Sequence, residues 1–151
     1  MPSTLIEVRR TYTPEEQVQL MNAVHSALVV AFKIPVEDRF IRLAEFAPHA
    51  MVNGLRDGVA DTYTRVTIDC FSGRSIAAKR ELYREIVDRL GEHGVPREHV
   101  SILLRESPPE NWGGSRAGRD PLDTQASRHV RTSPCGVTWR RVNKFGGPDS
   151  G

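Results

Sequence analysis

Two stretches of the chain repeat the same order of predicted elements, and this repeat limits the folds that are open to it. Each stretch is a strand, a helix and a second strand. From the start of the first helix at Thr13 to the next strand at Phe40 there are 27 positions, and from Ser75 to Val100 there are 25. A strand, helix and strand form a right-handed unit with two parallel strands. A duplicated βαβ unit predicts an α+β fold, in which a four-stranded sheet carries both helices on one face.

Local signals mark the first unit. Residues 2–8 (PSTLIEV) predict a buried strand. Residues 13–16 (TPEE) form a capping box, with threonine as the cap and proline at the first helical position. The helix should end by Lys33, because Pro35 restricts the residue before it to extended angles. A second alternating strand is predicted at residues 40–46.

The second unit has the same organisation. Residues 62–71 are rich in β-branched side chains, Ser75 can cap a helix, and residues 100–106 predict the last main strand. Between the two units, Asn53-Gly54 has the composition of a hairpin tip. The predicted sheet leaves one face without helices, and alternation directs Leu5 or Ile6 toward it. Further copies of the chain would cover that face, so we expect a homo-oligomer.

The charge of the chain is unevenly distributed. Residues 1–118 hold 15 basic and 16 acidic side chains, whereas residues 119–151 hold 6 basic and 3 acidic ones. We therefore predict one domain at 1–118 and a basic tail at 119–151, either disordered or resting on a neighbouring subunit. The basic tail, with Trp139 available for stacking on a base, is a possible nucleic-acid interface. The tail has few charges and the body has no net charge that would attract nucleic acid, so this is the least favoured hypothesis.

Other classes of protein are disfavoured by composition. No apolar run is long enough to span a membrane, and the first residues do not have the pattern of a secretory signal. Two cysteines, Cys70 and Cys135, are too few for a disulfide framework, so the cytoplasm is the expected location. Five histidines are scattered without the spacing of metal ligands, and Cys70 is interpreted as a buried thiol.

Pro2 follows the initiator methionine directly. Removal of Met1 would make Pro2 a free secondary amine, and terminal amines titrate at about pH 7.7–8.0. Burial beside another cation would lower that pKa and leave a neutral base or nucleophile. If Met1 is retained, Pro2 is an amide that merely begins a strand.

Together these features resemble the tautomerase superfamily. The residues that carry the resemblance are Pro2, residues 71–75 (FSGRS) with Lys79 after them, and residues 106–113 (ESPPENWG). The resemblance covers about residues 2–118 and is to the longer members, including malonate semialdehyde decarboxylases. It implies a trimer with an active site around each terminal proline, whose nitrogen moves a proton between carbon and oxygen of a 2-keto acid. It also implies that neither a cofactor nor a metal takes part.

Four further residues are candidates for the site. Arg74 would bind a substrate carboxylate and lower the pKa of the proline amine; otherwise it is a solvated loop arginine. Asp38 matches an aspartate of the decarboxylases and could orient water, although acidic turn residues are common. Trp112 could wall off the proline or anchor its own loop, and Arg116 could supply a further charge.

Those decarboxylases carry a pair of arginines two positions apart. In this chain either Ile76 or Ser72 stands in place of one of them, depending on the alignment. The leading hypothesis is therefore a cofactor-independent tautomerase in which Pro2 is the base or acid. Malonate semialdehyde decarboxylation is the alternative. A trimeric binding protein without catalytic activity is the alternative from another class.

Overall fold

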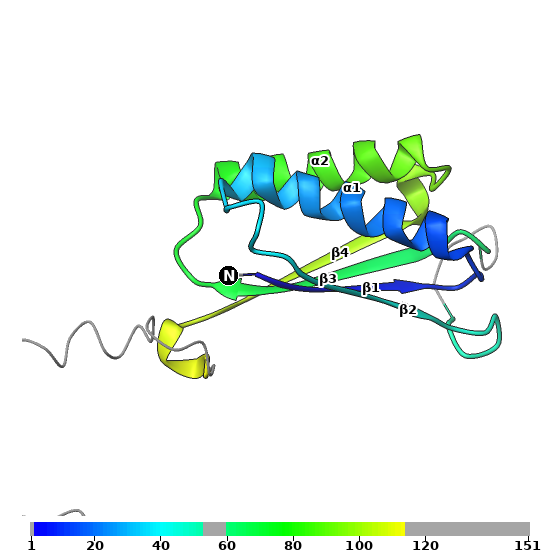
Figure 1. Ribbon diagram of the computed structural model, residues 1–151, viewed down its shortest axis with the longest axis horizontal. Coiled ribbons are helices and arrows are strands. Elements are labelled where there is room, and N and C mark those ends of the chain that lie inside the picture. The colour runs from blue at the N-terminus through cyan, green and yellow to red at the C-terminus, as the bar shows by residue number, and fades with distance from the viewer. Residues whose placement is uncertain (1, 53–59, 114–151) are drawn as a thin grey trace, which may run out of the picture. The chain divides into compact units, whose positions relative to one another are not determined.

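The predicted elements are present in the predicted order. The structure is a computed structural model that describes residues 2–52 and 60–113 (Figure 1). The main elements are β1 (Ser3–Val8), α1 (Pro14–Phe32), β2 (Phe40–Glu45), β3 (Thr64–Phe71), α2 (Ile76–Glu92) and β4 (Val100–Ser107). Two short 3-10 helices, which the sequence patterns did not predict, flank β4: η1 (Arg97–His99) and η2 (Pro109–Asn111).

The four strands form one sheet in the order β2-β1-β3-β4. β1 and β2 are parallel, β3 and β4 are parallel, and β1 and β3 run antiparallel. Each parallel pair is joined through a helix, so the sheet consists of two βαβ units joined along β1 and β3. The prediction of a duplicated unit is confirmed.

Both helices cover the same face of the sheet and lie side by side (Figure 1). The core lies between this helix layer and the sheet. Its fully buried side chains include Ile6, Val24, Ile68, Leu82 and Ile86, each 0% exposed. The register settles the alternative at β1: Ile6 faces the helices, and Leu5 faces the other side.

The helix boundaries follow from local chemistry. Thr13 Oγ1 accepts the Glu16 backbone N–H at 3.2 Å, and Glu16 Oε2 accepts the Thr13 N–H at 2.8 Å, which completes the capping box. α1 ends at Phe32, and the C-cap residue Lys33 has a left-handed φ of 52°. Ser75 Oγ accepts the Ala78 N–H at 3.1 Å and caps α2. The predicted caps are therefore confirmed.

The helix-free face of the sheet carries both apolar and charged side chains. Phe40 and Leu103 are 45% and 38% exposed there. Asp69 and Arg105 form an ion pair at 2.8 Å on the same face. Among the described residues, no helix is both long and apolar enough to cross a membrane. The predicted hairpin tip at Asn53-Gly54 and the tail at 119–151 lie outside the described residues.

Candidate active site

Pro2 lies at one end of the sheet, directly before β1, and is buried. Its neighbour Ser3 is opposite Phe40 on β2 and Asp69 on β3. Extending both registers by one residue places Pro2 between the start of β2 and Cys70. Pro2 has the same strand parity as the buried residue Thr4, so it belongs to the helix-facing side of the sheet.

Cys70 and Glu106 continue this row toward β4. They are register partners on β3 and β4, and Cys70 is 2% exposed. Burial raises the pKa of the Cys70 thiol and the Glu106 carboxylate raises it further, while Arg74 and Lys79 oppose both effects. The thiol therefore remains protonated near neutral pH, and the interpretation of Cys70 as a buried thiol is confirmed.

Arg74 lies in the loop between β3 and α2, at the same end of the sheet. Its Nη1 donates to the Phe32 carbonyl at 2.8 Å, and its guanidinium carbon lies 4.8 Å from the centre of the Phe32 ring. This carbonyl is at the C-terminal end of α1, where the helix dipole favours a cation. A guanidinium has five N–H donors, so this contact leaves donors for a carboxylate. Arg74 is thus half-buried and held by packing, not a freely solvated loop residue.

The loop that carries Arg74 is held by further contacts. The Ser72 N–H donates to the Ser107 carbonyl at 3.0 Å, and Gly73 has a φ of 112°, which side chains rarely allow. Lys79 on α2 donates to Glu106 Oε2 at 2.5 Å. This hydrogen bond and the Lys79 charge, with smaller contributions from the backbone N–H groups of Arg74 and Gly73, hold the pKa of Glu106 below its usual value.

Sequence reasoning missed the Lys79–Glu106 pair. One signal was available, because Glu106 is in phase with Ile102 and Leu104, which lean toward the helix layer. A carboxylate there is within reach of basic side chains on the helix layer, although Glu106 is itself exposed. The position of the partner on α2 could not be read from the sequence, because 27 residues separate the two side chains.

Asp38 lies in the turn before β2, where its N–H donates to the Pro35 carbonyl at 3.1 Å. It is partly exposed. The guanidinium of the neighbouring residue Arg39 contacts the Asn22 side chain on α1. Asp38 lies just before β2, at the same end of the sheet as Pro2. Its chemical role stays a prediction.

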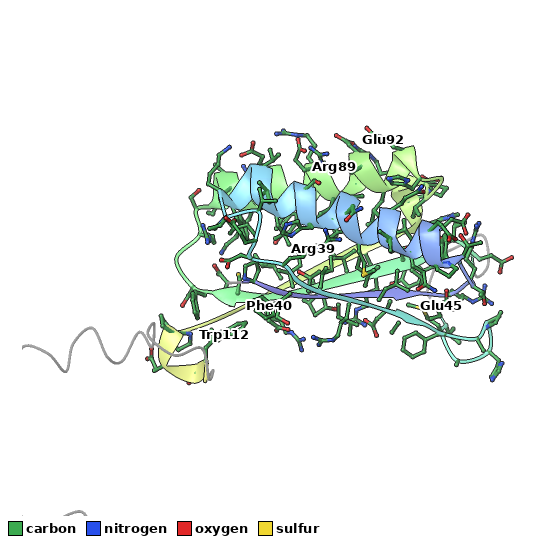
Figure 2. All side chains as sticks on the ribbon, in the orientation of Figure 1. Arg39, Phe40, Glu45, Arg89, Glu92 and Trp112 are labelled. Carbon is green, nitrogen blue, oxygen red and sulfur yellow. The ribbon has the colours of Figure 1, made fainter. Side chains whose placement is uncertain are left out.

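Trp112 packs at the other side of the sheet. Its Nε1 donates to Ser107 Oγ at 2.6 Å, and its ring meets Phe71 edge-on, with centroids 5.3 Å apart and planes at 75°. Phe71 has the parity of the helix-free face, and Figure 2 shows Trp112 beyond β4 on that side. Trp112 thus anchors its own loop, and the structure does not bring it next to Pro2 of the same chain. Arg116 lies outside the described residues.

The arrangement joins a buried position for a terminal amine, a half-buried guanidinium with free donors and a neutralised Lys79–Glu106 pair. Within residues 2–52 and 60–113, no three histidine, cysteine, aspartate or glutamate side chains are grouped to hold a metal ion. Acid–base chemistry on a small carboxylate is the reaction class that these groups can perform.

Comparison with known proteins identifies a family for this chain. A family model described as a tautomerase enzyme matches residues 38–115, a range that includes Asp38, Arg74 and Trp112. Comparison with curated proteins gives no significant match.

Solved structures with the same fold were also found. A malonate semialdehyde decarboxylase inhibited by 3-bromopropiolate is 24% identical with a TM-score of 0.73, over 82% of this chain and 96% of that one. Another malonate semialdehyde decarboxylase, studied for its decarboxylase and hydratase activities, is 25% identical with a TM-score of 0.71, over 82% and 98%. Native fused 4-OT is 16% identical with a TM-score of 0.71, over 82% and 98%. The predicted fold is thereby confirmed.

The family model covers just over half of the chain, from the turn before β2 to the end of the described residues. It includes the whole second βαβ unit and the loop that carries Arg74. The chain therefore belongs to the tautomerase family, and its relatives of known structure are enzymes of the tautomerase superfamily.

Proposed function

We propose that this protein is a cofactor-independent tautomerase that interconverts the keto and enol forms of a small 2-keto acid. The amine of Pro2, freed by removal of Met1, is the base and acid of the reaction. The observation that carries this proposal is the position of Pro2, which is buried at the same sheet end as the half-buried Arg74 guanidinium.

Keto–enol interconversion requires one base and one cation. Pro2 would remove a proton from the carbon next to the carbonyl and return a proton to oxygen, and the reverse reaction uses the same groups. Arg74 would hold the carboxylate with the N–H donors that Phe32 leaves free. Burial and the nearby guanidinium both favour the neutral form of the amine, so we expect its pKa to be below about 7.7.

Decarboxylation of malonate semialdehyde is the second candidate. The likeness to two malonate semialdehyde decarboxylases and the position of Asp38 favour it. The missing second arginine argues against it. Isoleucine and serine are uncharged, so neither Ile76 nor Ser72 supplies the charge that the second arginine would bring.

We propose that the active form is a homotrimer. The helix-free face exposes Phe40 and Leu103, and such apolar side chains on a sheet face favour a partner. Structures of fused 4-OT with this fold are trimers, both symmetric and asymmetric. In a trimer Trp112 could meet a neighbouring subunit.

The test uses the purified full-length chain. Intact mass shows whether Met1 is removed, and incubation with 3-bromopropiolate followed by peptide mapping locates any adduct. Keto–enol conversion of a small 2-keto acid and carbon dioxide release from malonate semialdehyde are measured in parallel, with Pro2→Ala as the control. An adduct on Pro2 with conversion that Pro2→Ala loses supports the proposal, and dominant carbon dioxide release selects decarboxylation. Retained Met1, or an unlabelled and inactive Pro2, overturns the proposal and favours a binding protein without catalytic activity.

A further inference from the structure

Glu106 has a position that the proposed reaction does not by itself explain. It is the last helix-facing residue of β4 and the register partner of Cys70, and Pro2 lies beside Cys70 on the next strand. Strands are about 4.8 Å apart, so the Glu106 position is about 10 Å from Pro2 across the sheet. Its carboxylate contacts Lys79 at 2.5 Å, and the backbone N–H groups of Gly73 and Arg74 are close enough to help lower its pKa.

We propose that Glu106 is a positioning residue of the active site: it fixes the loop that carries Arg74 and neutralises Lys79, so that Arg74 is the cation that acts on the Pro2 amine. This inference rests on the proposed function. Two consequences follow from it, one for the placement of the guanidinium and one for the charge around the amine.

The first consequence concerns the Arg74 loop. Ser72 and Arg74 are each tied to other elements, Ser72 to the Ser107 carbonyl and the Arg74 side chain to the Phe32 carbonyl. The Glu106 carboxylate adds a favourable electrostatic interaction with the main-chain N–H groups between them, at Gly73 and Arg74. Loss of this interaction would let the guanidinium move relative to Pro2, and binding of a carboxylate substrate would weaken.

The second consequence concerns charge. Several charged or titratable groups lie around the row from Pro2 to Glu106 on the elements packed there. They are Asp38 and Arg39 before β2, His25 and Lys33 on and after α1, Cys70 on β3, Arg74 in its loop and Lys79 on α2. Lys79 and Glu106 cancel each other. Removing one member of the pair leaves a full charge about 10 Å from Pro2, which corresponds to about one pKa unit at an effective dielectric constant of about 20.

The experiment measures the pKa of the Pro2 amine directly by NMR, in the mature chain labelled with ¹⁵N-proline. Pro2 is the one amine among the 10 prolines of the sequence, so its signal is distinct once Met1 is removed. Glu106→Gln should lower this pKa by about one unit, because Lys79 is then uncompensated. Lys79→Met should raise it by a similar amount, and the double variant should return close to the wild-type value. Glu106→Asp should keep the Pro2 pKa but raise KM several-fold, because the shorter side chain no longer reaches the N–H groups of the Arg74 loop.

Glu85→Gln is the matched control, since Glu85 pairs with Arg89 at 3.0 Å on the same helix and lies away from Pro2. It should change neither the Pro2 pKa nor KM. Opposite shifts in the two single variants that cancel in the double variant support the proposal. An active wild type in which Glu106→Gln leaves both the Pro2 pKa and KM unchanged overturns the role of Glu106 and leaves the proposed function standing. A wild type that retains Met1, or that is inactive and unlabelled, overturns the proposed function and this inference with it.

Discussion

Replacement of Arg74 by methionine separates its structural contribution from its catalytic one. Methionine keeps much of the apolar stem but loses the Nη1 hydrogen bond to Phe32, at 2.8 Å, and the guanidinium over the Phe32 ring, at 4.8 Å. A hydrogen bond from a charged donor contributes about 1.5 kcal/mol at the lower end of its range, which suits a half-buried site. A cation over an aromatic ring adds about 0.5 kcal/mol. The free energy of unfolding should therefore fall by about 2 kcal/mol.

For a domain of this size, that loss corresponds to a fall in Tm of about 8 °C. Urea unfolding and thermal unfolding would measure it, at one fixed protein concentration because an oligomer is stabilised by association. Arg97→Met is the matched control. Arg97 pairs with Asp88 at 3.1 Å and its side chain is 73% exposed, so its loss should cost less than about 0.5 kcal/mol.

The catalytic readout of the same variant is kcat/KM for a small 2-keto acid. It should fall about 100-fold, because the proposed bidentate contact between the Arg74 guanidinium and the substrate carboxylate is lost. Arg74→Lys retains the charge but lacks the planar fork, so it should recover only part of this loss. If Arg74→Met unfolds with the same free energy as Arg97→Met, the contacts to Phe32 do not stabilise the fold. If its kcat/KM equals that of the wild type, Arg74 does not bind the carboxylate.

Three further predictions follow from the described contacts. Thr13→Ala should lower the free energy of unfolding by about 1 kcal/mol through loss of the capping box, and Thr13→Ser, which keeps the oxygen, should restore most of it in urea unfolding. Glu106 has a folded-state pKa below its unfolded value, so its stabilising effect is present above about pH 4.5 and is lost as pH falls through the folded value. The free energy of unfolding of the wild type should therefore fall more between pH 7 and pH 3 than that of Glu106→Gln. Equal falls in the two proteins would contradict this. Phe40→Asp on the helix-free face should reduce the assembly to monomers in analytical ultracentrifugation, whereas a trimer that tolerates Phe40→Asp would exclude that face as the interface.

Much of the candidate site could be proposed from the sequence, mainly through the resemblance of its motifs to a known family. Pro2, Asp38, Arg74 and Trp112 were singled out by motif, and the family model spans three of them. The structure places Pro2 and Arg74 at one sheet end but directs Trp112 to the opposite face through its contact with Phe71. Strand parity decides this, because a residue's face depends on a register that the motif does not contain.

The sequence by itself determined the elements and their order, because the responsible interactions are local. The Thr13 cap, the left-handed Lys33 before Pro35 and the alternation in the strands each involve neighbours within a few residues. The tertiary structure alone decided that Phe32 meets Arg74, 42 residues away, and that Lys79 meets Glu106, 27 residues away. Such contacts depend on how the sheet register and the helix layer fit together, and no local pattern of residues records that fit.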